Sequence, residues 1–261
     1  MKMTNKMILP RYTMNMSAEK YDRLYMEDIQ AHQRRLKHEY PDLRRRLIKA
    51  IKFPFRYMVK QMHGKEEYRA YGTINRKDEI FTTGIDITSV VFFKNSRGTC
   101  AYVDLDPYRL TDKRGIYNMT GARTSHRYLF TPHFFDRYEM RHGWDDGFSD
   151  IHDQFFINNI SKGDDYCFYT QITAARPDDY KTLDVWVLCK DGLMLGEIMN
   201  EVDFLEGKDY ILKINTFLDF ETLTKRQDKY ANLLEDMKAV YDEIPHVESL
   251  DTILKRSFIV S

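Results

Sequence analysis

Residues 183–199 read L-D-V-W-V-L-C-K-D-G-L-M-L-G-E-I-M. The run from Leu183 to Cys189 is rich in β-branched and aromatic residues, which is typical of a strand. Lys190 to Gly192 forms a turn signal, and Leu193 to Met199 supplies a second strand. Two strands joined by so short a turn run antiparallel, because a parallel pair needs a long crossover. This stretch therefore predicts a β-hairpin.

A second hairpin is expected over residues 85–105, where Ile85 to Lys94 and Thr99 to Leu105 flank an N-S-R-G turn. Shorter strands are expected at residues 68–74, 80–83, 127–130, 166–173 and 210–217, while residues 108–121 are expected to be irregular. Because hairpins dominate, the sequence favours a mixed, mostly antiparallel sheet over a doubly wound one.

Helix signals lie at both ends of the chain. Ser17 is a suitable N-cap for a helix over residues 18–39, and Pro41 both breaks that helix and starts another over residues 42–62. Thr131-Pro132 starts a helix to His142 with Gly143 as its C-cap, and Ser149 caps a helix over 150–160. A long helix is expected from Asp219 to about Pro245, with a short element at 247–254. The predicted fold is α+β, with a basic helical arm (1–63) and a core domain with a C-terminal helix (64–261).

Composition indicates which broad class of protein the chain belongs to. The 261 residues are 43% hydrophobic, 14% aromatic and 31% charged, which is typical of a folded chain with a substantial core. Three widely spaced cysteines make no disulfide framework. The N-terminus has no secretory apolar segment, and no apolar run approaches the roughly 20 residues needed to span a bilayer. We therefore expect a cytoplasmic, soluble protein with no membrane partner.

Residues 123–153 hold four of the eight histidines and form the one clear concentration of reactive side chains. His133, Arg137 and Arg141 are spaced i, i+4 and i+8, so they are expected along one face of the 132–142 helix. A neutral histidine in the first turn suits proton abstraction, and arginines suit phosphate binding. Such a set can cleave RNA without metal. His126 is a candidate second acid, and Arg123 and Arg127 are candidate phosphate contacts.

The segment L-F-T-P-H-F-F-D-R-Y-E-M-R, residues 129–141, carries a resemblance. A strand followed by a helix with an H-x-x-x-R-x-x-x-R pattern resembles the toxin-type ribonucleases of the barnase, EndoU, colicin and RelE-like group. The likeness covers about fifteen residues and the order of the elements after them. It implies metal-independent RNA cleavage, with His133, Arg137 and Arg141 at the matched positions, and no cofactor.

A metal site is the competing interpretation of the same stretch. Its potential ligands are His126, His133, His142, His152, Asp145, Asp146, Asp150 and Asp153. However, it has no H-E-x-x-H helix and no cysteine pair. Asp104 and Asp106 form another conceivable magnesium pair, although a strand ending in an Asp-Pro turn is the simpler explanation for them. The chain has no P-loop, Rossmann or nucleophile-elbow motif.

The N-terminal arm is strongly basic. Residues 1–60 carry 15 Lys or Arg and 6 Asp or Glu, a net charge of +9, although the whole chain has a net charge of zero. The candidate nucleic-acid contacts in this arm are Arg34, Arg35, Arg44, Arg45, Arg46 and Lys49. The alternative is that the arm packs on the acidic remainder of the chain.

Two functions follow from these patterns. The first is RNA binding or metal-independent RNA cleavage. The second is a non-enzymatic interaction or structural protein, with a protein partner or a second copy, because tyrosine and phenylalanine are abundant and aromatics concentrate at interfaces. Whether the protein is an enzyme is left open by the sequence.

Overall fold

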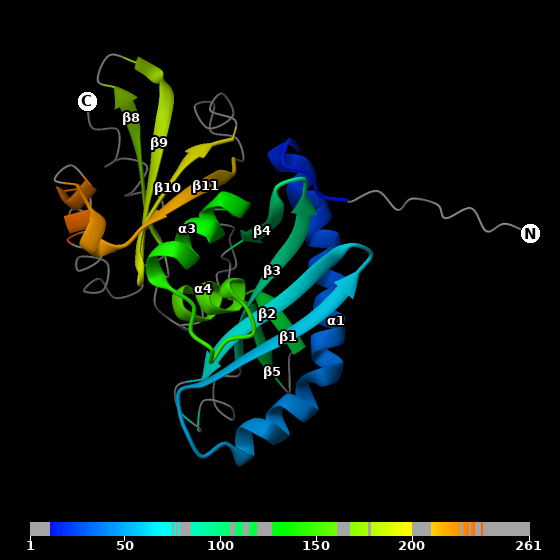
Figure 1. Ribbon diagram of the computed structural model, residues 1–261. Coiled ribbons are helices and arrows are strands. Elements are labelled where there is room, and N and C mark those ends of the chain that lie inside the picture. The colour runs from blue at the N-terminus through cyan, green and yellow to red at the C-terminus, as the bar shows by residue number, and fades with distance from the viewer. Residues whose placement is uncertain are drawn as a thin grey trace, which may run out of the picture.

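The computed structural model describes residues 11–74, 76, 78, 85–104, 108–111, 115–118, 127–160, 168–176, 179–199, 210–224, 227–229, 231, 232 and 236. Within these ranges the fold is α+β, as the sequence predicts, with helices packed on a large sheet (Figure 1).

Eleven strands of the described chain form one sheet, whose main path is β1-β2-β3-β4-β7-β11-β10-β9-β8. β5 pairs with β3, and β6 pairs with β5. The β7–β11 pair is parallel, and the other described pairs are antiparallel, so the sheet is mixed and mostly antiparallel. The strands are Phe55–His63 (β1), Glu66–Ile74 (β2), Ile85–Asn95 (β3), Gly98–Asp104 (β4), Tyr108–Thr111 (β5), Gly115–Asn118 (β6), Arg127–Phe130 (β7), Tyr169–Arg176 (β8), Asp179–Cys189 (β9), Gly192–Ile198 (β10) and Leu212–Leu218 (β11).

Both predicted hairpins are confirmed. β9 pairs with β10 through Cys189 and Gly192, and β3 pairs with β4 through Asn95 and Gly98. The Asn95 side chain accepts hydrogen bonds from the backbone N–H groups of Arg97 at 2.7 Å and of Gly98 at 3.0 Å. This local bonding explains why an asparagine stands at the turn.

The N-terminal helix α1 spans Ala18–Lys49 and is capped by Ser17 as predicted. It continues through Pro41, whereas the sequence predicts a break there. Pro41 is exposed, and its neighbours Tyr40 and Leu43 are buried against the sheet. Their packing outweighs the roughly 3 kcal/mol that an interior proline costs a helix.

The second predicted helix, over residues 42–62, is confirmed only as far as Lys49, where its residues are the last turns of α1, and is wrong beyond it. α1 ends at Lys49, and residues 55–63 form strand β1, paired with β2 along its whole length. Gly72 of β2 lies opposite Tyr57, and a Cβ at Gly72 would collide with the Tyr57 ring. Strand β1 therefore depends on the close packing of Tyr57 against Gly72, 15 residues away in the chain, and local sequence propensity does not predict that contact. The division into domains 1–63 and 64–261 stays a prediction.

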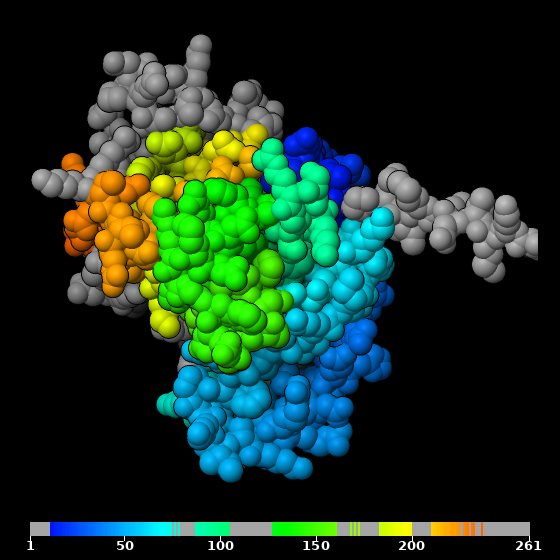
Figure 2. Space-filling model, viewed as in Figure 1, coloured from blue at the N-terminus to red at the C-terminus, as the bar shows by residue number. Residues whose placement is uncertain are grey.

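The sheet separates two cores, because side chains alternate along its strands. Tyr68, Val91 and Tyr102 face α1 in one buried cluster. Tyr71, Val90 and Val103 face the helices α3 (Pro132–His142) and α4 (Ile151–Asn159) in another. Figure 1 shows α1 behind the sheet and the other two helices in front of it, and Figure 2 shows the latter in green over the front face.

Helix α3 spans Pro132–His142 and has the predicted Thr131 and Gly143 caps. Helix α4 spans Ile151–Asn159, but its N-cap is Asp150 and not the predicted Ser149. The Asp150 carboxylate accepts the hydrogen bond from the Asp153 N–H at 2.8 Å. Ser149 instead donates its hydroxyl to the Asp153 carboxylate.

Two further expectations need correction. Residues 108–121, expected to be irregular, contain β5 and β6. Asp219 caps only the 3₁₀ turn Phe220–Thr222, after which Leu223 is extended, so no long helix starts there. Residues 227–229, 231, 232 and 236 are helical, but the long helix of the described chain is α1. The predicted elements at 80–83 and 247–254 lie outside the described residues.

Candidate functional site

His133 and Arg137 lie together on the exposed side of α3. His133 is exposed, Arg137 is half-buried, and Arg137 Nε lies 3.4 Å from His133 Nε2. Thr131 Oγ1 caps the helix at 3.3 Å from the Phe134 N–H, and the first turn contains no acidic residue. The pair therefore presents an imidazole and a guanidinium near a helix N-terminus that has no acidic side chain in its first turn, an arrangement that can attract an anion.

Arg141 does not complete this pair. Its guanidinium donates to the backbone carbonyl of Phe217, at the end of β11. That hydrogen bond gives the Phe217 carbonyl a donor and connects α3 to the sheet. The i+8 spacing from His133 does not reveal this structural role. His126 and Arg123 lie outside the described residues, so the predicted set is placed only in part.

Arg127 is buried, with 6% of its surface exposed, which contradicts its predicted role as a phosphate contact. Its Nε lies 3.0 Å from the Asp22 carboxylate of α1, which also accepts a hydrogen bond from the Tyr102 hydroxyl at 2.8 Å. Arg127 thus joins α1 to β4 and β7 inside the protein. A buried cation of this kind needs a carboxylate partner, and Asp22 supplies it.

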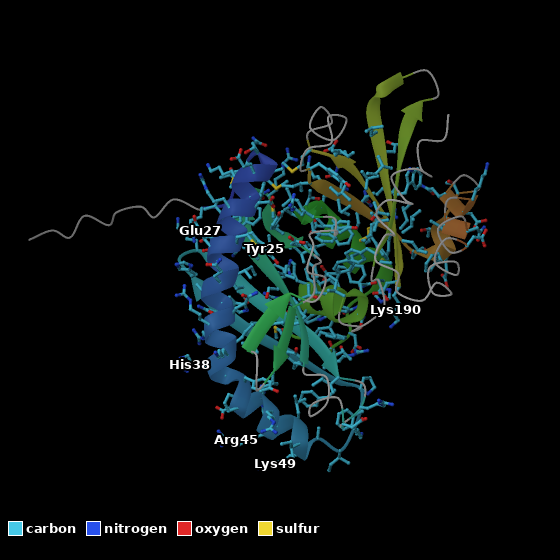
Figure 3. The ribbon with its side chains drawn as sticks, turned by 180° about the vertical axis from the view of Figure 1, so that it is seen from behind. Tyr25, Glu27, His38, Arg45, Lys49 and Lys190 are labelled. Carbon is cyan, nitrogen blue, oxygen red and sulfur yellow. The ribbon has the colours of Figure 1, made fainter. Side chains whose placement is uncertain are left out.

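The basic residues of α1 lie on its outer side. The buried positions Leu36, Tyr40, Leu43 and Leu47 form one face of the helix, and Arg34, His38, Arg45 and Lys49 lie on the opposite face. Figure 3 shows His38, Arg45 and Lys49 along this outer side.

Ion pairing neutralises only part of this surface. Residues 34–52 contain eight Lys or Arg but only two acidic residues, which pair with Arg35 and Arg45. Arg34 donates to the carbonyl of Gln30 at 3.2 Å. Within the described ranges no carboxylate lies at ion-pair distance from a further set of exposed side chains, namely Lys37, Arg46, Lys49 and Lys52.

The two candidate surfaces are therefore on opposite faces of the sheet. α1 covers one face and α3 the other, so one phosphate group cannot contact both Arg45 and His133. The expectation that the arm adds phosphate contacts to the histidine region has to be replaced by two separate surfaces.

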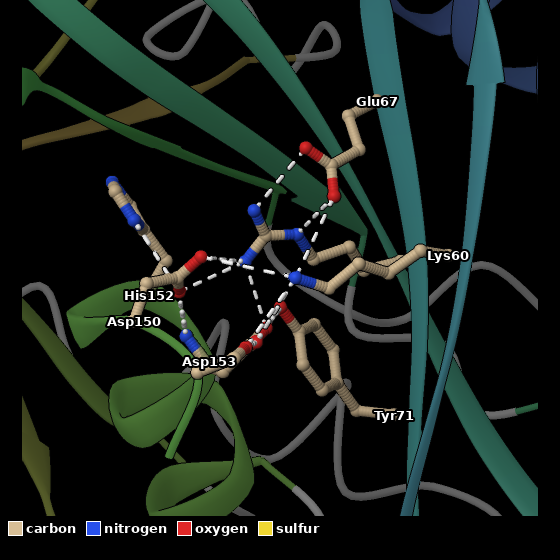
Figure 4. Close-up of polar contacts among 8 residues, drawn as sticks. Lys60, Glu67, Tyr71, Asp150, His152 and Asp153 are labelled. Atoms are coloured by element: carbon tan, nitrogen blue, oxygen red, sulfur yellow. Dashed lines mark hydrogen bonds and ion pairs between the residues drawn. The ribbon is translucent and has the colours of Figure 1, made fainter. Parts of the chain in front are cut away.

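The sequence interpretation missed a polar cluster between β1, β2 and α4 (Figure 4). Arg69 is buried, and its guanidinium donates to Asp153 at 2.7 Å, to Asp150 at 2.9 Å and to Glu67 at 2.8 Å. The Tyr71 hydroxyl donates to Asp153 at 2.8 Å. Lys60 Nζ lies 3.3 Å from the same carboxylate. The alternating pattern Glu67-x-Arg69-x-Tyr71 places all three side chains on one face of the strand, and this pattern could have predicted the cluster.

The charges in this cluster hold helix α4 to strands β1 and β2. Burial alone would raise the pKa of Asp150, but hydrogen bonds from His152 and Arg69 outweigh it and hold this pKa well below its ordinary value. Burial, and then the charge of Asp153, raise the pKa of Tyr71 well above its ordinary value. Tyr71 thus stays protonated and donates, while Asp150 stays ionised and accepts.

A second buried carboxylate, Asp28 of α1, holds the segment that precedes the helix. It accepts hydrogen bonds from Arg11, from the Tyr12 hydroxyl at 3.0 Å and from the Tyr68 hydroxyl. His63 Nδ1 lies 3.4 Å from it. Asp28 therefore connects residues 11–12, α1 and β2.

The remaining histidines of the 123–153 stretch that the structure places serve packing. The His142 ring stacks on Tyr138 with centroids 5.0 Å apart, and the His152 ring packs on Phe135 at 4.4 Å. Across the described residues, no three His, Cys, Asp or Glu side chains gather as a metal site would require.

The abundant aromatic residues mostly form the interior. The largest fully buried side chains are all tyrosines and phenylalanines, and Phe130, Phe134 and Phe155 meet at ring distances of 4.9–5.3 Å. Within the described chain, the exposed large apolar side chains are Ile51, Met62, Met140, Trp144 and Phe220. Composition alone therefore does not indicate an aromatic surface.

No family model, no curated protein and no solved structure matches this chain. The resemblance to toxin-type ribonucleases accordingly stays a prediction. In the part of the chain that the structure describes, no helix combines the length and apolarity needed to cross a membrane.

Proposed function

We propose that this protein binds RNA through the outer face of α1, by contacts to the phosphate backbone. The supporting observation is the set of exposed Lys and Arg side chains on that face that have no carboxylate partner among the described residues. Arg34 and Lys49, which have no such partner, are spaced over 16 residues, which corresponds to roughly 24 Å of helix. That length matches several consecutive phosphates. Arg45 lies between them on the same face, and its pair with Asp42 leaves the Arg45 side chain 74% exposed.

The aromatic residues of α1 do not contribute to this surface. Tyr21, Tyr25 and Tyr40 are buried and face the sheet, so they cannot stack on bases. Binding then depends on charge, and we expect it to be tolerant of sequence and steeply dependent on salt.

Replacing Arg34, Arg45 and Lys49 together with glutamine is expected to weaken RNA binding about tenfold or more at low salt. The slope of log affinity against log salt should also become shallower by about 0.7 for each phosphate that the variant no longer neutralises. Fluorescence anisotropy of a labelled single-stranded RNA, titrated at several salt concentrations, measures both quantities.

The matched control replaces three exposed lysines on other elements, Lys65, Lys94 and Lys190, with glutamine. It removes the same charge, so a general electrostatic effect would weaken both variants equally. Equal affinities for the two variants, or no binding by the wild type at low salt, would exclude the α1 surface.

A second function is cleavage of RNA without a metal at His133, supported by the exposed His133–Arg137 pair. His133 acts as the base that removes the 2′-hydroxyl proton, and Arg137 stabilises the phosphoryl oxygens. The 2′-oxygen then forms a bond to phosphorus as the P–O5′ bond breaks, and the 5′-oxygen takes a proton from water, which leaves a 2′,3′-cyclic phosphate and a 5′-hydroxyl end. With RNA in EDTA, His133→Ala is expected to reduce cleavage by roughly 10²- to 10⁴-fold. His63→Ala, which removes an exposed histidine on β1 that belongs to neither candidate surface, is the control. Intact RNA with the wild type, or equal cleavage by His133→Ala, would exclude this activity.

A further inference from the structure

A mixed apolar and acidic surface lies at the end of α3. We call it the α3 patch, and its members are Glu139, Met140, Trp144, Asp145 and Asp146. Met140 is 64% exposed and Trp144 is 54% exposed. The three carboxylates are exposed, and none has an ion-pair partner among the described residues. Two large apolar side chains thus lie near three carboxylates in the chain, and the Arg137 guanidinium also approaches Met140, with 3.9 Å between Nη1 and Sδ.

The backbone on both sides of Trp144 is held in place by a side chain of α4. Gln154 of α4 is buried, and its amide donates to the Gly143 carbonyl at 2.9 Å and accepts from the Asp145 N–H at 2.8 Å. Both residues that flank Trp144 are therefore anchored by one side chain. An indole presented on such a fixed backbone loses little conformational entropy when it is covered by a partner.

A complementary surface lies at the end of α1. We call it the α1 tip, and its members are Lys49, Ile51 and Lys52. Ile51 is 95% exposed. Both lysines are exposed, and neither has an ion-pair partner in the described chain. Figure 2 shows this part of the chain, in blue, at the lower end of the molecule.

We propose that the α1 tip of one copy binds the α3 patch of a second copy. The lysines meet the carboxylates, and Ile51 packs against Met140 and Trp144. Within one copy these surfaces belong to helices on opposite faces of the sheet, so they do not satisfy each other. A net charge of zero also removes the long-range repulsion that would oppose association.

The contact joins two different surfaces, so a pair of copies keeps one free patch, on the copy that uses its tip, and one free tip, on the other copy. Such a head-to-tail contact extends into chains or closes into a ring, unlike a twofold dimer. It does not depend on the RNA binding proposed above. Because the tip adjoins the RNA-binding face, RNA and a second copy are expected to compete.

Sedimentation of the nucleic-acid-free protein over a range of concentrations tests the contact. We expect the average mass to rise above that of two chains at low salt and to return toward one chain at high salt. A single-chain mass at every concentration, or association only after RNA is added, would overturn the proposal. The second outcome would leave the RNA-binding function intact.

Two variants then identify the surfaces. The tip variant is Ile51→Ser with Lys52→Ser, and the patch variant is Met140→Ser with Trp144→Ser; all four side chains are exposed, so both variants should fold. Each variant alone should stay monomeric. Because each keeps the surface that the other lacks, an equal mixture should form a complex of two chains and nothing larger. A mixture that stays monomeric while the wild type associates would contradict the head-to-tail contact.

Tryptophan fluorescence gives a second readout. Trp186 is 6% exposed and provides a constant background, so concentration-dependent changes report on Trp144. Emission of the wild type should shift to shorter wavelength as the chains associate, and emission of the tip variant should not. Met62→Ser removes another exposed apolar side chain, on β1, and should associate as the wild type does. Loss of association in this control would point to a different surface.

Discussion

Replacing Arg69 with methionine is expected to lower the free energy of unfolding by about 3 to 5 kcal/mol, the usual effect of removing one partner from a buried ion pair. The change leaves the buried Asp153 carboxylate without its guanidinium contact at 2.7 Å and removes a donor from Asp150 and Glu67. Methionine fills similar space but cannot donate. Urea denaturation followed by circular dichroism measures the change, together with a fall of about 6 to 20 °C in Tm.

The effect of this substitution should depend on pH. The folded-state pKa of Asp150 lies below the value of about 3.9 that an aspartate has in an unfolded chain. Its contribution is therefore present above about pH 4 and is lost as the pH falls further. The difference between wild type and variant should shrink on acidification. Arg76→Met, which removes an exposed pair with Asp78 at 3.3 Å, should change stability by less than about 1 kcal/mol. An equal loss for both variants would contradict the role assigned to Arg69.

Replacing Asp28 with alanine is expected to cost a similar amount, about 3 to 5 kcal/mol. The substitution leaves the hydroxyl groups of Tyr12 and Tyr68 buried without this acceptor and removes the carboxylate that binds Arg11. Because Asp28 holds the segment before α1, limited proteolysis should also cut near residues 11–16 sooner than in the wild type. Denaturation curves and the time course of cleavage test the two consequences.

The adjacent residue provides the control for Asp28. Glu27 pairs with the same arginine at 3.1 Å, but its side chain is 57% exposed. Glu27→Ala removes the same charge from the same helix turn and should cost at most about 1 kcal/mol. If Glu27→Ala and Asp28→Ala destabilise the protein equally, burial is not what gives Asp28 its importance.

Much of the fold could be predicted from local patterns. The hairpins at Asn95–Gly98 and Cys189–Gly192, and the caps of α3, are properties of a few neighbouring residues, and they are confirmed. The errors share a physical cause. The helix continues through Pro41 because the neighbouring Tyr40 and Leu43 pack against the sheet, and residues 55–63 form a strand because they pair with β2. No local pattern reports those contacts.

The candidate site could be predicted less well. The spacing of His133 and Arg137 correctly indicates a shared helix face, and the contact at 3.4 Å follows from it. The same spacing says nothing of the Phe217 carbonyl that binds Arg141 or of the Asp22 carboxylate that binds Arg127. The sequence pattern around an arginine does not distinguish one that faces solvent from one that pairs with a buried group. The α1 surface and the α3 patch likewise depend on which charges remain unpaired after folding.

The parallel β7–β11 pair has a consequence for how the chain folds. It joins residues 128–130 to residues 212–214, whereas the hairpins on either side close through turns of a few residues. Closing a long loop costs more entropy than closing a turn. The hairpins on either side of the β7–β11 pair can therefore form before that pair does. During synthesis, strand β7 has to wait for β11 to leave the ribosome. Until then the edge of β7 that pairs with β11 is open and can pair with a wrong strand.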